Sequence, residues 1–279
     1  MEIWYGLIDQ LVPFEWAGHI FMKNALLAVL LIGPLFGILG TMVVGSNMAF
    51  FSDAIGHSAL TGIAIGVILG MNDPLWAMLI FSVLLAVGIT LVKGRTATSA
   101  DTLIGVFMAT ALALGVVILS RGGGFARYSR YLIGDLLSIA PPEVGMLALV
   151  LGGVLVFWGL GFNRLLLLGV NPSLALSRGV RVRRLEVFFS VVMAVTVTVS
   201  IQWVGILIIN ALLVLPAAAA RNVSTGMRCY HLVSVLLTLV SGLTGLILSY
   251  YWGTATGATI VLVAAVFYSV SLWLRPRVA

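Results

Sequence analysis

The chain has 279 residues, of which 61% are hydrophobic and only 9% are charged, and its mean hydropathy is +1.18. Soluble domains are about 45–50% apolar and about 25% charged, so this composition excludes a cytosolic enzyme, a nucleic-acid-binding module and a disordered protein. The net charge of +6 comes from 15 basic and 9 acidic residues, and most basic residues stand between hydrophobic runs, where they orient a protein in a membrane.

The first 18 residues hold polar and aromatic residues rather than an apolar run. Trp4, Tyr5 and Trp16 have amphipathic rings that suit the headgroup layer of a bilayer. No basic residue precedes Lys23, so the segment does not have the form of a secretory signal peptide. We therefore predict that residues 1–18 are an interfacial lead-in, with a frayed tail as the alternative.

The rest of the chain is a series of apolar segments. A bilayer core of about 30 Å needs about 20 apolar helical residues, and the segments that approach this length are 20–44, 48–70, 74–92, 102–120, 143–162, 186–201, 203–220, 231–251 and 254–274. Only Gln202 separates the segments 186–201 and 203–220, and Pro216 would break or kink a helix over the second. Eight spans is therefore the alternative to nine. We expect an all-α polytopic membrane protein with about 8–9 transmembrane helices in a single domain over residues 1–279.

The distribution of basic residues predicts how these spans are oriented. If the loop at 163–185 is cytoplasmic and nine spans alternate outward from it, 11 basic residues fall inside and 4 outside, which accounts for all 15. This arrangement predicts an external N-terminus and a cytoplasmic C-terminus.

One acidic residue lies within an apolar span rather than at its end. If the chain turns at Gly45–Asn47, the next helix starts near Met48, so that Asp53 is about 8 Å and His57 about 14 Å along it. Ionisable residues at such a depth mark a functional site, and residues four apart share one helix face. Carboxylate and imidazole together suit Zn²⁺, Mn²⁺ or Fe²⁺, and two copies of the pair across a symmetric dimer would supply four ligands.

The alternative for this site is purely structural. Ser52 or Asp53 would cap a helix that begins at a water boundary, and His57 would be incidental. Gly62, Gly66 and Gly70 repeat every four residues in the same span, and we interpret that spacing as close helix packing.

The loop from residue 163 to 185 contains a predicted short helix. Asn171 and Pro172 form a good helix start, and Gly179 is a good stop. Such a helix can dock on a partner protein, and a basic topology anchor is the alternative. His19, His231 and Cys229 lie at or just inside membrane edges, and we assign no role to them.

Several common motifs of nucleotide-binding proteins and hydrolases are absent from the sequence. There is no G-x-x-x-x-G-K-[ST] phosphate loop, no H-E-x-x-H motif and no G-x-S-x-G elbow. The sequence therefore shows no group of catalytic residues that would support an intramembrane enzyme. An ion-coupled secondary transporter that uses Asp53 and His57 as a proton or cation relay remains an alternative function.

Four sequence blocks in order resemble a known family. They are Met48–Gly62 with its D-x-x-x-H pattern, Tyr131–Ile139, Asn171–Glu186 and Val204–Ala219. From about Met22 to Tyr268 the chain resembles the membrane permease subunit of ATP-binding-cassette importers for zinc, manganese or iron(II), and the block around Asp135 is most similar to zinc relatives.

The resemblance implies a set of partners and site residues. It implies a dimer with a second copy of this permease in the cytoplasmic (inner) membrane of a bacterial-type cell. It also implies two ATPase subunits that hydrolyse ATP, and an extracytoplasmic metal receptor that docks around 121–142, 71–74 and 252–254. It implies that the transported ion passes Asp53 and His57, and that no cofactor is permanently bound. The implied ATPase-coupling residues are Asn171, Pro172, Leu174, Ala175, Arg178 and Gly179. Asn210 and Pro216 of the fourth block are assigned to the pathway or its gate.

Overall fold

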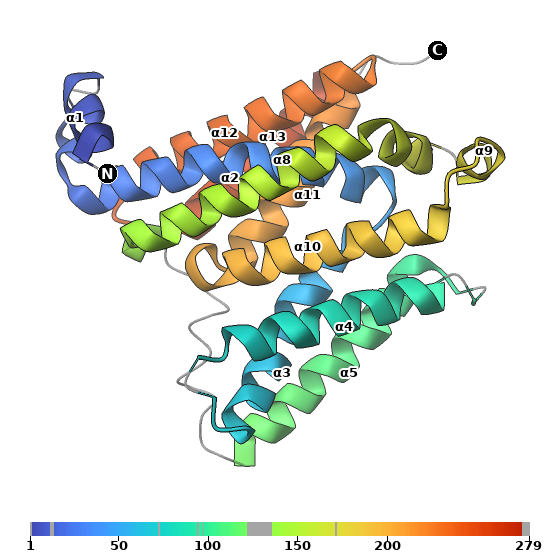
Figure 1. The fold of residues 1–279 in the computed structure, drawn as a ribbon. Coiled ribbons are helices and arrows are strands. Elements are labelled where there is room, and N and C mark those ends of the chain that lie inside the picture. Colours follow the sequence, from blue (N-terminus) through green and yellow to red (C-terminus); the bar gives the residue numbers. More distant parts are fainter. Residues whose placement is uncertain are drawn as a thin grey trace. The chain divides into compact units, whose positions relative to one another are not determined.

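A computed structural model describes residues 2–11, 14–71, 73–93, 95–96, 98–121, 136–170 and 172–274, and these residues contain helices and no strand. The elements are α1 (Glu2–Leu11), η1 (Glu15–Gly18), α2 (Ile20–Gly45), α3 (Phe51–Ile68), α4 (Leu75–Lys93), α5 (Ala100–Arg121), η2 (Leu136–Ser138), α8 (Pro141–Val170), α9 (Pro172–Ser177), α10 (Val182–Val204), α11 (Ile206–Val223), α12 (Met227–Trp252) and α13 (Thr256–Leu274). Figure 1 shows their course.

Nine of the helices in the described residues are long and apolar enough to cross a membrane. They confirm the all-α polytopic fold, and they favour nine spans over eight because α10 and α11 are separate helices. The break lies at Gly205, where φ is +84° and ψ is 153°, a conformation that is open essentially to glycine alone. Pro216 does not break its helix, because α11 continues through it to Val223.

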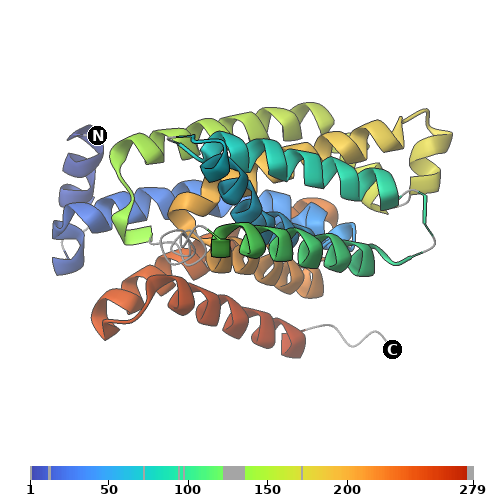
Figure 2. The ribbon, with the colours of Figure 1, turned by 90° about the horizontal axis from the view of Figure 1, so that it is seen from below.

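The chain divides into two compact units, one formed by Met1–Thr41, Gly134–Leu155 and Trp203–Ala279, the other by Met42–Ile133 and Val156–Gln202. In the first unit α12 and α13 lie side by side (Figures 1 and 2). A Cβ added at Gly245 would lie 2.5 Å from Ile260 Cα, and one at Gly37 would lie 2.7 Å from Val235 Cα. Glycine therefore lets these helix backbones approach closely.

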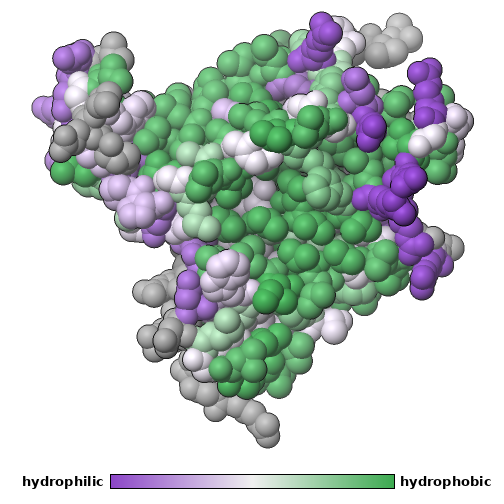
Figure 3. All heavy atoms as spheres, viewed as in Figure 1, coloured by the Kyte–Doolittle hydropathy of each residue, from purple (hydrophilic) through white to green (hydrophobic). Residues whose placement is uncertain are grey.

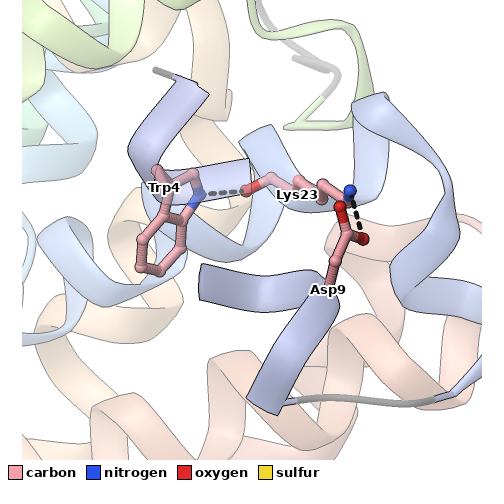
Figure 4. A network of polar contacts seen from close by, with 3 residues as sticks. All are labelled: Trp4, Asp9 and Lys23. Atoms are coloured by element: carbon pink, nitrogen blue, oxygen red, sulfur yellow. Dashed lines mark hydrogen bonds and ion pairs between the residues drawn. The ribbon is translucent and has the colours of Figure 1, made fainter. Parts of the chain in front are cut away.

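The N-terminal helix α1 is attached to the start of α2. Figure 4 shows Trp4 Nε1 donating to the backbone oxygen of Lys23 at 3.1 Å, and Lys23 Nζ bonded to Asp9 Oδ1 at 2.6 Å. Tyr5 Oη also donates to Asn24 Oδ1 at 2.7 Å. These contacts disfavour a frayed tail, and the interfacial position of residues 1–18 stays a prediction.

The second unit is built around α3, which packs against α4 and α5 (Figures 1 and 2). Cβ atoms added at Gly62 and Gly66 would lie 2.6 Å from Met78 Cα and 3.0 Å from Ala77 Cβ, respectively. The packing role predicted for these two glycines is thus confirmed. Gly70 is different, since nothing lies within 4 Å of its added Cβ and its φ is +69°. It ends α3 in a left-handed turn, so the packing interpretation was wrong at that position.

Large apolar side chains also lie on the outside of the helices. Hydrophobic residues cover the visible surface over α4, α8 and α10 in Figure 3. Leu84, Leu149 and Leu160 are 65%, 77% and 84% exposed. Exposure of this kind is expected where lipid tails rather than water surround the protein.

The contact between α3 and α5 gives a stability prediction. A Cβ at Gly115 would lie 2.6 Å from Thr61 Oγ1 and 3.0 Å from Thr61 Cα, and that hydroxyl donates to the backbone oxygen of Ala111. We expect Gly115→Ala to destabilise the protein by about 1–3 kcal/mol through overpacking, measured as a lower thermal transition in detergent.

The matched control is Gly105→Ala in the same helix, where nothing lies within 4 Å of the added Cβ. It should leave stability unchanged or raise it by up to about 1 kcal/mol, because alanine favours helix more than glycine does. Equal destabilisation by both substitutions would contradict the close α3–α5 contact.

Candidate functional site

The turn between α2 and α3 determines where the candidate ligands lie. The helix α2 ends at Gly45, and Asn47 adopts the left-handed conformation with φ +52°. The Met48 amide donates to Val43 O at 3.0 Å and the Asn47 amide to Val44 O at 3.3 Å. This is the hydrogen-bond pattern of a Schellman cap, and asparagine is one of the few residues besides glycine that tolerate its geometry. The predicted turn at Gly45–Asn47 is confirmed.

The start of α3 differs from the sequence prediction by three residues. The helix begins at Phe51 rather than near Met48, because residues 48–50 complete the turn, with the Phe51 amide donating to Met48 O at 3.0 Å. Asp53 consequently lies in the first turn, about 3 Å from the start, and His57 lies about 9 Å from it. The predicted values of about 8 Å and 14 Å were too large.

Asp53 and His57 occupy the one open side of α3 along its first half. Every other residue from Phe51 to Ala64 is buried, whereas the side chains of Asp53 and His57 are 30% and 34% exposed. The face that these two residues share is therefore the face that the fold leaves accessible. The remaining sides of the helix are used for packing.

The two side chains point toward each other, with His57 Nε2 3.4 Å from Asp53 Oδ1. Two ligands at about 2.1 Å from a tetrahedral metal ion lie about 3.4 Å apart, so one ion can contact both atoms. No group of three or more His, Cys, Asp or Glu residues that could hold a metal occurs in the described part of the chain. A single chain thus brings two ligands to this face.

The alternative that Ser52 or Asp53 caps α3 is weakened for Ser52. Within the described residues Ser52 Oγ is buried without a hydrogen-bond partner, so Ser52 does not cap α3. The N-cap position is occupied by Phe50, whose side chain makes no capping hydrogen bond. Asp53 lies in the first turn of the helix and contacts His57.

The predicted short helix in the 163–185 segment is present as α9. It begins at Pro172, and Gly179 follows it with φ +74°. The Val180 amide donates to Ala175 O at 3.0 Å, which confirms Gly179 as the stop. Asn171 lies outside the described residues. Residues 163–170, which we expected in the loop, are the last two turns of α8.

The side chains of α9 divide into a buried and an exposed set. Ala175 is fully buried, while Leu174 and Leu176 are 43% and 61% exposed. Arg178, just after the helix, is exposed as well. A short helix with exposed leucines and a following arginine is suited to contact with another protein.

Two further predicted residues belong to the first unit. Asn210 is half-buried and Pro216 is buried, both in α11. Asp135 and residues 122–134 of the expected receptor-facing loop lie outside the described residues.

The three residues without an assigned role make local contacts. His19 Nε2 lies 3.3 Å from Tyr250 Oη, and His231 Nδ1 lies 2.7 Å from Met227 O in its own helix. Cys229 is exposed. These contacts fit structural positions better than a metal site.

The sequence did not reveal the contacts between α4 and α10. Thr90 Oγ1 and Ser190 Oγ lie 2.7 Å apart in a buried position, and Lys93 Nζ lies 3.9 Å from Glu186 Oε1. These residues help to line a cavity of about 240 Å³ beside the Gly45–Met48 turn. The available signal was weak, since it consisted of opposite charges at the ends of two predicted spans on one side of the membrane.

The open face of α3 predicts a pattern of chemical accessibility. In a Cys229→Ser background, Asp53→Cys and His57→Cys should react with a small hydrophilic thiol reagent much faster than Ala54→Cys and Ser58→Cys, because the last two positions are fully buried. The measurement is the labelling rate in membranes at matched abundance. Equal rates at all four positions would contradict the geometry.

Comparison with known proteins places the chain in a family. The high-affinity zinc uptake system membrane protein ZnuB of Haemophilus influenzae is 33% identical over 91% of this chain and 97% of its own length. The manganese import system permease protein ScaB of Streptococcus parasanguinis is 32% identical over 97% of this chain and 94% of its own length. A solved structure, PsaBC from Streptococcus pneumoniae in complex with Fab, matches with a TM-score of 0.80 at 27% identity, over 99% of this chain and 97% of that one. The model of the ABC 3 transport family matches residues 18–275, and the chain therefore belongs to the ABC 3 transport family.

Proposed function

We propose that this chain is the permease subunit of an importer that moves a divalent transition-metal ion into the cytoplasm by ATP-driven alternating access. The observation that carries the proposal is the Asp53–His57 pair, which forms the open face of the first half of α3, a helix long and apolar enough to span a membrane. The names of the similar proteins, a zinc uptake and a manganese import component, support the same class of cargo.

The ligand set is suited to transport rather than to permanent binding. An ionised carboxylate in a low-dielectric surrounding attracts a divalent cation strongly, and neutral imidazole binds Zn²⁺, Mn²⁺ and Fe²⁺. One carboxylate and one imidazole hold an ion less tightly than a cage of four thiolates. We propose that two copies of the chain place their pairs around one pathway, so that the ion meets four ligands.

Further subunits complete the proposed importer. We propose that two cytoplasmic ATPase subunits bind at α9 and hydrolyse ATP, and that an extracytoplasmic receptor delivers the ion. The permease itself is a transport subunit without catalytic residues of its own in this scheme. Its N-terminus is placed outside and its C-terminus in the cytoplasm, as the distribution of basic residues favours.

In the second unit the chain and a series of contacts lead from α9 to Asp53 and His57. The helix α10 follows α9 closely in the chain and contacts α4 through Thr90–Ser190 and Lys93–Glu186. The helix α4 in turn packs against α3 at Gly62. We propose that movement of α9 by the ATPase reaches the metal ligands through these contacts.

Zinc is the first candidate cargo, and Mn²⁺ or Fe²⁺ are the others. Similarity to relatives does not separate them, because the zinc and manganese proteins are 33% and 32% identical to this chain. The ligand types do not separate them either, since affinity follows metal availability as well as donor chemistry.

The test is the metal content of cells that carry the permease with its ATPase and receptor. We expect Asp53→Ala and His57→Ala to reduce accumulation of one metal roughly 10-fold or more, since even outer-sphere changes cost about 10–100-fold in metal affinity. Inactivation of the ATPase should reduce accumulation of the metal by at least as much.

Two control variants separate the site from general damage. Asp101 also lies in the first turn of a spanning helix, so Asp101→Ala controls for loss of a carboxylate at a helix start, and His231→Ala controls for loss of an imidazole. Both should accumulate metal normally. Uptake that survives Asp53→Ala and His57→Ala would refute the site, and uptake that survives the inactive ATPase would favour the secondary transporter.

The contacts between α4 and α10 give a separate prediction. Both charged side chains are about one-third exposed or less, so Lys93→Glu alone and Glu186→Lys alone should change stability by no more than about 1 kcal/mol. Each should nevertheless reduce metal uptake several-fold while the ATPase still binds and hydrolyses ATP. The double exchange should restore much of the uptake. Full uptake in both single variants would remove this pair from the proposed route.

A further inference from the structure

Four arginines surround a cavity at the end of α8 and the start of α10. The cavity measures about 510 Å³, and its lining includes Arg164, Arg178, Arg181 and Arg184 but no acidic residue. Within the described part of the chain none of the four guanidinium groups forms an ion pair. Hydrophilic residues gather on the visible surface near α9 and the start of α10 (Figure 3). Four uncompensated positive charges around one cavity attract an anion strongly.

An apolar groove lies next to this cavity. Its volume is about 620 Å³, and its apolar lining consists of Leu91, Leu176, Val182, Val187, Phe188 and Val191. Arg181, Arg184 and Phe188 line both spaces, so the two adjoin each other. Phe188 is 55% exposed and its ring meets Phe157 edge-on with centroids 5.1 Å apart, which gives the groove an exposed aromatic wall.

The groove runs along the beginning of a membrane span. The helix α10 is one of the candidate spans and begins at Val182, so Arg181, Arg183 and Arg184 lie where a span meets the headgroup layer. From Val182 to Val191 the helix rises about 14 Å, which is close to half of the roughly 30 Å hydrocarbon core. For a span that begins at Val182, Arg181, Arg183 and Arg184 fall at headgroup level, and Val187, Phe188 and Val191 fall at acyl-chain level.

We propose that this site binds an anionic phospholipid, with the phosphate among the arginines and one acyl chain in the groove. Arginine matches phosphate oxygens in charge and geometry, and basic pockets at the cytoplasmic ends of spans are suited to anionic headgroups. A soluble anion would use the arginines and leave the groove empty. The acidic surface of a partner protein would have no use for an apolar groove at acyl-chain depth. The bound lipid would stabilise the segment that connects α9 to α10. Its binding does not depend on the identity of the transported ion.

The experiment measures lipid retention by the full-length chain, purified with its ATPase subunit and exchanged into vesicles of phosphatidylcholine with phosphatidylglycerol. After detergent extraction, native mass spectrometry should show phosphatidylglycerol retained preferentially, at about one molecule per chain. Arg181→Gln combined with Arg184→Gln should reduce that retention several-fold. Arg228→Gln is the control, because Arg228 is an exposed arginine at the start of another span, and it should retain the lipid like the wild type.

Competition with the wild-type protein tests the groove without any substitution. Phosphatidylglycerol with long acyl chains should displace the bound lipid efficiently, whereas the six-carbon analogue and inorganic phosphate at millimolar concentration should not. Displacement by inorganic phosphate would show a soluble-anion site and overturn the proposal. Unchanged retention in the folded double variant would also overturn it. Loss of the ATPase subunit with the lipid still bound would assign the arginines to protein docking instead.

Discussion

The close approach of α3 to α4 and α5 is the interaction on which the candidate site depends. Lipid tails are as apolar as leucine, so helices in a bilayer associate through packing and hydrogen bonds rather than by expulsion of water. Gly62 and Gly115 remove the Cβ atoms that would otherwise separate the backbones, and Thr61 adds a hydrogen bond to Ala111 O. With three sides of α3 committed to packing, the position of Asp53 and His57 on the fourth is fixed by the fold.

Most of the fold could be predicted from hydropathy, because a backbone in hydrocarbon must satisfy its own hydrogen bonds and therefore forms helices of nearly fixed length. The helix ends at Asn47 and Gly179 could be predicted for a related reason, since few residues adopt the left-handed conformation there. The start of α3 could not be predicted to the residue, because the turn uses residues 48–50 in hydrogen bonds that hydropathy does not report. The packing interpretation was wrong at Gly70 because the same four-residue spacing arises when the last glycine ends the helix.

The candidate site was only partly visible in the sequence. Asp53 and His57 stood out because a carboxylate and an imidazole interrupt an apolar run at helical spacing. Their surroundings were not visible, since the burial of Ala54 and Ser58 beside them depends on neighbours distant in the chain. The same is true of Lys93–Glu186, and of Lys23, which is 6% exposed although it stands at a span end. Its amine lies beside Asp9, a partner that only the docking of α1 supplies.

The length of α8 has a mechanical consequence. Its 30 residues correspond to about 45 Å, well beyond the roughly 30 Å of hydrocarbon, and Leu165 and Leu168 in its last turns are buried. The last turns of α8 are thus held by packing within the protein. α8 ends at Val170 and α9 begins at Pro172, so the position of α9 follows that of these packed turns. A force applied to α9 by a partner would therefore be passed directly to the packed end of a long helix.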